Sequence, residues 1–244
     1  MHSECFFRGD MKKLKLFFDY FTKFEKILWS VSVILIISTF IFLENNGLLT
    51  LIASIVGITA LLFNAKGNPV GPLLMIVFSI LYGIISFSFA YYGEMITYVG
   101  MSLPMAVLSL VTWLKNPYKG KKSQVTVNAV KKKEIVLLIL FSIGVAILFY
   151  FILKYFNTAN LILSTVSVLT SFIAAYLTFR RSPFFAFAYA LNDVVLIAMW
   201  ILASIKNLGY VSVIICFLIF LVNDLYTFSC WLKLQKKQNI GDRA

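Results

Sequence analysis

The stretch Trp113-Leu114-Lys115 ends one long apolar run, and the same three residues return as Trp231-Leu232-Lys233 at the end of the last apolar run. In each half, a further apolar run opens at a proline, Pro69 in the first half and Pro183 in the second. The two halves therefore echo each other about 115 residues apart. A hydrophobic chain built twice from one unit is typical of transporters whose site lies between the two copies.

The composition places the chain in a membrane. Of the 244 residues, 61% are hydrophobic and 13% are charged, and the mean hydropathy is +0.90. A soluble domain of this size could not cover so much apolar surface. The apolar runs have the length of transmembrane helices, about 20 residues, whereas the strands of a membrane β-barrel alternate over about ten. We therefore expect an all-α integral membrane protein.

The apolar runs predict eight transmembrane helices, over residues 27–43, 48–63, 70–92, 95–114, 135–153, 160–178, 183–205 and 210–232. The spacing of the two echoed segments indicates two parallel three-helix repeats joined by a linker helix, a 3+1+3 plan, with an extra helix at the N-terminus. The expected segments are a basic amphipathic N-terminus (1–26), an extra helix (27–43), a first repeat (48–114), a basic loop (115–134), a linker helix (135–153), a second repeat (160–232) and a basic tail (233–244).

The positive charges predict the orientation. Of the 22 lysines and arginines, all but Lys154 and Lys206 fall on one side of the eight predicted helices. Positive residues gather on the cytoplasmic side, so we expect both termini in the cytoplasm and a multi-pass protein of the plasma membrane. The net charge of +12 is then a signal of topology and of attraction to the anionic lipid bilayer, not of a nucleic acid partner.

The motifs of common enzymes are missing from the sequence. We find no phosphate-binding loop, no zinc motif and no nucleophile elbow. The three cysteines, Cys5, Cys216 and Cys230, have neither the number of a disulfide framework nor the spacing of metal ligands. The sequence therefore predicts no catalytic residues, no metal and no cofactor, which argues against an enzyme and against an ATP-driven pump.

Two acidic residues stand inside predicted helices, and each follows an asparagine: Asn192-Asp193 and Asn223-Asp224. A carboxylate at membrane depth costs about 2.5–3.5 kcal/mol, so it is expected to face a cavity or a polar partner. One interpretation is a polar patch that binds a hydrophilic or cationic solute. The alternatives are hydrogen bonds that hold the last two helices together, or an aspartate that carries a proton in a proton-coupled transporter.

Aromatic residues extend this candidate site. Trp200 follows Asp193 by seven residues and shares its helix face, so the indole could stack on a flat solute, although an anchor at the membrane interface is equally compatible. Tyr82 and Tyr98 are further candidates for solute contact, with a structural role as the alternative. Pro104 interrupts a predicted helix near its centre and is interpreted as a hinge or a static bend.

Tryptophans beside lysines at the ends of the two echoed segments, Trp113 and Trp231, are interpreted as anchors at the membrane interface.

The chain resembles the Pnu-type family of nicotinamide riboside transporters. The resemblance rests on five motifs and covers roughly residues 48–235. They are Asn68-Pro69, Tyr91-Tyr92-Gly93-Glu94, the stretch from Trp113 to Lys122, the stretch from Asn192-Asp193 to Trp200, and Trp231-Leu232-Lys233.

The resemblance implies a fold related to the SWEET sugar transporters, often a homotrimer, and uptake of a nucleoside-like vitamin by facilitated diffusion with trapping by phosphorylation in the cytoplasm. It implies solute contacts at Asn192, Asp193 and Trp200. Members of the family carry nicotinamide riboside, thiamine, riboflavin or deoxynucleosides. The chain departs from the family where relatives often have a tryptophan beside the proline, since Asn68 and Val70 flank Pro69 here. The fourth predicted helix also lacks the usual glutamine and paired tryptophan, and these departures concern the choice of solute within the family. Nicotinamide riboside is the expected solute, because its positive charge suits Asp193, and the other three are alternatives.

Overall fold

The structure is a computed structural model, and it describes residues 19–42, 47–88, 92–205 and 211–241. Its elements are α2 (Lys23–Phe42), α3 (Leu48–Ala65), α4 (Val70–Ser88), α5 (Tyr92–Thr97), a π-helical turn (Tyr98–Ser102), α6 (Leu103–Lys115), β1 (Pro117–Tyr118), β2 (Lys121–Val125), α7 (Lys132–Tyr155), α8 (Leu161–Phe179), α9 (Phe184–Ser204) and α10 (Val211–Gly241). Within the described residues, eight helical segments are long and apolar enough to cross a membrane, counting α5 to α6 as one. The prediction of a helical membrane protein is confirmed, and the described residues add one two-stranded sheet.

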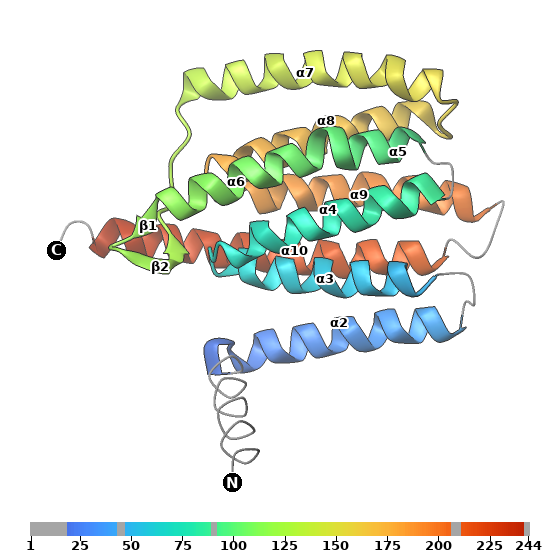
Figure 1. Ribbon diagram of the computed structural model, residues 1–244. Coiled ribbons are helices and arrows are strands. Elements are labelled where there is room, and N and C mark those ends of the chain that lie inside the picture. Colours follow the sequence, from blue (N-terminus) through green and yellow to red (C-terminus); the bar gives the residue numbers. More distant parts are fainter. Residues whose placement is uncertain (1–18, 43–46, 89–91, 206–210, 242–244) are drawn as a thin grey trace, which may run out of the picture.

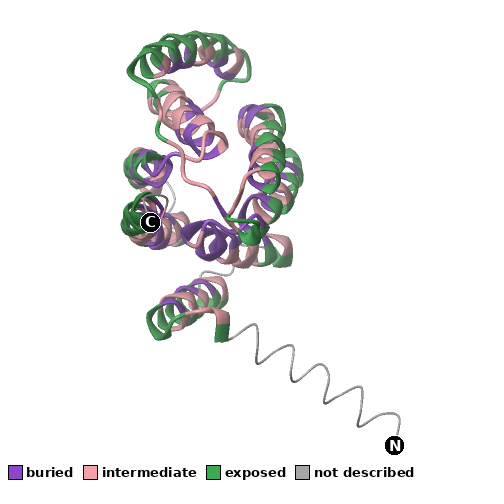
Figure 2. Ribbon diagram, turned by 90° about the vertical axis from the view of Figure 1, so that its left-hand side faces the viewer, coloured by how far each residue is buried: buried purple, intermediate pink, exposed green. Residues whose placement is uncertain are grey.

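The helices close into a ring. Contacts run from α3 to α4, from α4 to α6, from α6 to α8, and then through α9 and α10 back to α3. Helix α7 packs on α8 outside the ring, and α2 packs on α3 and α10 at the opposite side (Figure 1). Buried residues face the inside of the bundle and exposed residues face outward, as the end-on view in Figure 2 shows. The exposed apolar side chains of α2 and α7 suit contact with lipid.

Two connections of the ring are built alike. After α3 the chain turns at Gly67, with φ of 64°, and the Asn68 N–H donates to the Phe63 carbonyl. After α8 it turns at Arg181, with φ of 58°, and the Ser182 N–H donates to the Leu177 carbonyl. A left-handed residue with this hydrogen bond is a common way to end a helix. The next helix of each pair then starts beside Pro69 or Pro183, where proline fits without strain.

The predicted basic loop and tail contain regular structure. Strands β1 and β2 pair antiparallel within 115–134, α7 begins at Lys132, and α10 continues to Gly241. The segment 115–134 is therefore not an irregular loop throughout, and the described part of the tail over 233–244 continues a helix. The hairpin and the end of α10 pack against each other, because the buried Gln238 side chain accepts from the Val127 N–H at 2.8 Å and donates to the Val125 carbonyl at 3.0 Å. We call this the hairpin end of the bundle, and the other end the far end.

The tryptophans of the two echoed segments are not anchors at a membrane interface, which corrects the sequence interpretation. Trp113 and Trp231 are both fully buried, with ring centroids 5.4 Å apart. Trp113 donates its indole N–H to the Thr178 carbonyl at 2.9 Å, and Trp231 donates to the Asn64 carbonyl at 2.7 Å. Val125 of β2 belongs to the same buried cluster as both rings, so the hairpin helps to enclose them.

The fourth predicted helix is divided. Instead of one α-helix over 95–114, the chain forms α5, one π-helical turn and α6, and it begins at Tyr92. The Leu103 N–H donates to the Tyr98 carbonyl, five residues back, directly before Pro104. A proline has no N–H to donate, so the hydrogen-bond ladder is already weakened at this point. Single π-helical turns often mark functional sites.

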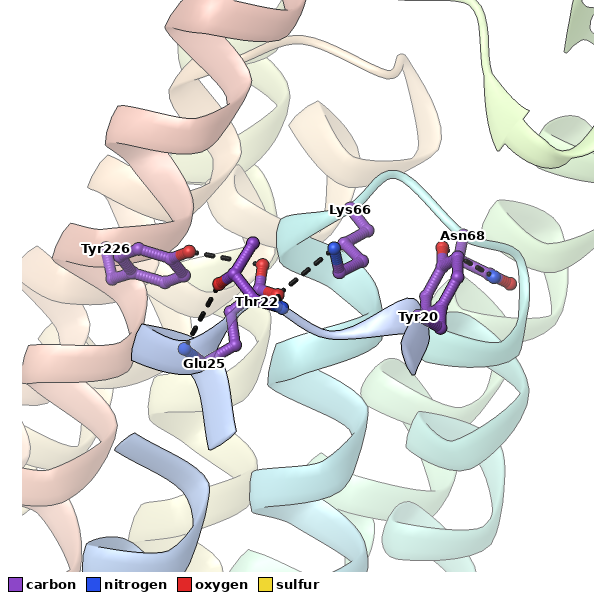
Figure 3. A network of polar contacts seen from close by, with 6 residues as sticks. All are labelled: Tyr20, Thr22, Glu25, Lys66, Asn68 and Tyr226. Atoms are coloured by element: carbon purple, nitrogen blue, oxygen red, sulfur yellow. Dashed lines mark hydrogen bonds and ion pairs between the residues drawn. The ribbon is translucent and has the colours of Figure 1, made fainter. Parts of the chain in front are cut away.

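The extra helix α2 is fastened to the ring by the polar network of Figure 3. The buried Glu25 carboxylate accepts from the Thr22 N–H at 2.7 Å and the Tyr226 hydroxyl at 3.1 Å, and it pairs with the Lys66 ammonium at 3.1 Å. The Glu25 N–H donates back to the Thr22 hydroxyl, which completes a capping box. The helix starts at Lys23, earlier than the predicted residue 27, because of this cap. Of the predicted N-terminal segment, 1–18 lies outside the described residues.

We expect Glu25→Gln to lower the unfolding temperature of the purified protein. The amide keeps the shape of the side chain but loses the charge that pairs with Lys66, which costs about 1–3 kcal/mol for a hydrogen bond to a charged group. The exposed Lys23 lies outside this network, so Lys23→Gln is the matched control. Equal unfolding temperatures for the two variants would show that the network does not hold α2.

Candidate functional site

A cavity of about 120 Å³ lies inside the ring, and helices α3, α4, α6, α8, α9 and α10 all contribute to its wall. Its residues near the hairpin end include Asn64 and Thr178, whose carbonyls accept the hydrogen bonds of the two buried tryptophans. Towards the far end the wall is aromatic, with Tyr82 and Tyr98. None of the described residues that line this central cavity is a lysine or an arginine.

A pair of carboxyl groups dominates the polar side of the cavity. Asp193 on α9 and Asp224 on α10 are both buried, and their side chains contact each other. The Asp193 Oδ2 and Asp224 Oδ1 atoms have no hydrogen-bond partner within the described residues. Two adjacent carboxylates repel each other unless a proton or a cation lies between them. The pair can therefore hold a proton or attract a cationic group.

The neighbouring amide is held in one orientation. The Asn192 Oδ1 atom accepts from the Ser167 hydroxyl at 3.0 Å and from the Thr170 hydroxyl at 2.9 Å, both on α8. The two hydrogen bonds of this amide among the described residues are both to its oxygen. The hydroxyls of α8 thus orient a donor at the cavity wall.

Two tyrosines form the aromatic wall. The rings of Tyr82 on α4 and Tyr98 in the π-helical turn have centroids 4.8 Å apart and are tilted by 40°. Phe78 extends the cluster, at 4.9 Å from the Tyr82 ring. The π-helical turn sets the position of Tyr98, because the backbone hydrogen bond from Leu103 to Tyr98 spans five residues instead of the four of an α-helix.

The other predicted site residues lie elsewhere. Asn223 is buried but faces away from the cavity, because its Nδ2 donates to the Ile219 carbonyl at 2.8 Å and to the Ser32 hydroxyl of α2 at 3.4 Å. Trp200 lines a second cavity of about 70 Å³ together with Glu94. Pro104 does not line the central cavity, although its neighbours Ser102 and Met105 do.

Several residues of the cavity escaped the sequence analysis. Asn64 and Ser79 line it, and the Asn64 Oδ1 and Ser79 Oγ atoms have no hydrogen-bond partner within the described residues. Tyr189, one helical turn before Asp193, lines it as well. In the sequence, the polar residues of α3 and α4 were only a weak indication of a binding site, because single asparagines and serines are common in membrane helices. The expectation that only Asp193 and Asp224 stand inside helical spans was wrong, because Glu25, Glu94 and Glu134 also belong to spans, each near the start of its helix.

The arrangement suits one kind of solute. Among the described residues, it combines carboxyl groups without a basic partner, an oriented amide, two unpaired acceptors and an aromatic wall inside a ring of helices. A flat cationic ring would be attracted by the carboxyl groups and the aromatic faces, and hydroxyl groups would satisfy the acceptors.

Comparison with known proteins agrees with the fold. A family model described as "Nicotinamide mononucleotide transporter" matches residues 47–233. The chain is 23% identical over 227 residues to the nicotinamide riboside transporter PnuC of Neisseria mucosa, which covers 91% of this chain and 86% of the relative. A crystal structure of the vitamin B3 transporter PnuC superimposes with a TM-score of 0.76 at 23% identity, covering 89% of this chain and 94% of that chain.

Proposed function

We propose that this chain, which belongs to the nicotinamide mononucleotide transporter family of membrane transporters, imports nicotinamide riboside by facilitated diffusion. The observation that carries the proposal is the buried carboxyl pair of Asp193 and Asp224 in a cavity whose described wall has no basic residue. Nicotinamide riboside has a pyridinium ring with a permanent positive charge and a ribose with hydroxyl groups. The carboxyl pair complements the ring, and the Asn64 and Ser79 oxygens can accept from the ribose.

The same charges favour the riboside over its phosphorylated form. A phosphate adds about two negative charges, which the carboxyl pair would repel and no lysine or arginine of the described wall would offset. Phosphorylation after entry would therefore trap the vitamin in the cell, since the product would no longer fit the pathway. Thiamine is also cationic, whereas riboflavin and deoxynucleosides are neutral and would gain less from the pair.

The proposal includes the topology and the assembly expected from the sequence. We place the protein in the plasma membrane with both termini and the hairpin end in the cytoplasm, where 20 of its 22 basic residues would then lie. The similar turns at Gly67 and Arg181 support two parallel three-helix repeats joined by α7. The homotrimer implied by the family resemblance stays a prediction.

A proton-coupled transporter is the second candidate. The observation in its favour is the contact between Asp193 and Asp224, because two adjacent carboxyl groups readily hold one proton. In this mechanism the proton gradient would drive accumulation, and neutral solutes would be carried as well as cationic ones.

Uptake into proteoliposomes without a kinase separates the two candidates. For facilitated diffusion we expect radiolabelled nicotinamide riboside to reach the outside concentration and stop, with the same result when an uncoupler is present. Thiamine, riboflavin, deoxynucleosides and nicotinamide mononucleotide should compete less well than unlabelled riboside. Accumulation above the outside concentration that collapses with an uncoupler would favour proton coupling instead.

A further inference from the structure

The second cavity lies at the far end of the bundle. Its wall includes Glu94 near the start of α5, Thr158 in the connection from α7 to α8, Ser164 near the start of α8, and Trp200 near the end of α9. These helix ends lie opposite the hairpin in Figure 1. With the orientation proposed above, the far-end cavity is the one that faces the outside of the cell.

The far-end cavity holds an acidic group without a basic partner. No described residue forms an ion pair or a hydrogen bond with the Glu94 carboxylate, and no lysine or arginine is among the described residues that line the cavity. Gly93 brings α5 close to the neighbouring connection, because a Cβ atom there would lie 2.5 Å from the Thr158 hydroxyl. The backbone therefore holds Glu94 against this wall. A cation would complete the site, and the indole of Trp200 offers it an aromatic face.

The two cavities share a wall. Tyr82, Tyr98 and Phe217 line both of them, so the two neighbouring tyrosine rings form a partition between the two spaces. Ser167 lines the far-end cavity and donates its hydrogen bond to Asn192, which lines the central one. A solute that leaves the far-end cavity towards the middle of the bundle therefore meets the tyrosine rings first and the oriented amide next.

We propose that the far-end cavity is a separate entry site, in which Glu94 and Trp200 bind the cationic ring of the solute before it passes the tyrosine partition to the central cavity. The inference rests on the proposed function, because that function supplies the cationic heteroaromatic solute. It adds a second acidic site in series with the first. The ring, not the ribose, is the part that the far-end site recognises.

Fluorescence of Trp200 tests the entry site with N-methylnicotinamide, a permanently cationic ring without ribose. We expect this probe to quench a component of the emission that is absent in Trp200→Phe, and neutral nicotinamide to need a much higher concentration for the same quenching. In Glu94→Gln the dissociation constant for the probe should rise about tenfold, because the substitution removes one contact between the cationic ring and a negative charge. Glu94→Asp keeps the charge and should stay close to the unchanged protein.

The central aspartate provides the matched control. Asp193→Asn should keep the quenching of Trp200 by N-methylnicotinamide, since Asp193 does not line the far-end cavity. Identical quenching curves for Glu94→Gln and the unchanged protein would overturn the inference, as would equal quenching by nicotinamide. Quenching that depends on Glu94 in a protein that takes up no nicotinamide riboside would support the entry site and refute the proposed function.

Discussion

We expect uptake of nicotinamide riboside to fall about 10- to 100-fold in Asp193→Asn, and uptake of a neutral competing solute to fall much less. The physical reason is the loss of a buried charge that, in the proposed site, would face the pyridinium ring, because a hydrogen bond or contact to a charged group contributes about 1.5–3 kcal/mol. Asparagine keeps the size of the side chain, so the helices α9 and α10 can pack as before. The measurement is initial uptake into proteoliposomes with labelled riboside and a labelled deoxynucleoside.

Two controls make this result specific. Asp19→Asn removes a carboxylate from an exposed position outside the cavity and should leave uptake unchanged. The unfolding temperature of Asp193→Asn should not fall, since the substitution also removes the repulsion from Asp224. An equal loss of uptake for the cationic and the neutral solute would refute the charge argument and leave Asp193 with a structural role.

The largest effect on stability is expected at Trp231. Trp231→Ala removes a fully buried side chain and the hydrogen bond to the Asn64 carbonyl, which costs about 3–5 kcal/mol. The loss also reaches Trp113, whose ring lies 5.4 Å away, and Phe185, whose ring lies 4.9 Å away. We expect a large drop in the unfolding temperature and in the amount of folded protein recovered.

A series at this position separates packing from hydrogen bonding. Trp231→Phe keeps a ring and should cost about 1–3 kcal/mol, chiefly for the carbonyl left without its donor. Leu232→Ala, at a neighbouring residue that is 40% exposed, is the control and should change the unfolding temperature little. If Trp231→Ala were no worse than Leu232→Ala, the interpretation as a membrane anchor would be right after all.

Sequence reasoning was most successful where the signal is local. The eight apolar segments follow from hydropathy alone, because a helix in lipid satisfies its own backbone hydrogen bonds and needs about 20 apolar residues. The placement of Asp193 and Asp224 at the central cavity follows from the cost of a carboxylate in the membrane. Both inferences depend on the solvent around the chain more than on its neighbours.

Spacing along a single helix did not predict which residues share the central cavity. Trp200 shares a helix face with Asp193 but lies seven residues further along, about 10 Å, which is enough to place it beyond the tyrosine partition. Asn223 directly precedes Asp224, yet consecutive residues of a helix point about 100° apart, so the asparagine faces α2 and the aspartate faces the cavity. Periodicity predicts the face of a residue, and neighbouring helices decide what that face meets.

The sequence by itself determined that the chain is a bundle of eight membrane helices with two acidic residues towards its interior, because hydropathy and the cost of buried charge act at each residue separately. Only the tertiary structure decided that Trp113 and Trp231 lie under a hairpin instead of at the lipid interface, and that Glu94 and Trp200 share a second cavity. These features depend on contacts between segments far apart in the chain, and a local pattern such as Trp-Leu-Lys is the same whether lipid or a β-hairpin covers it.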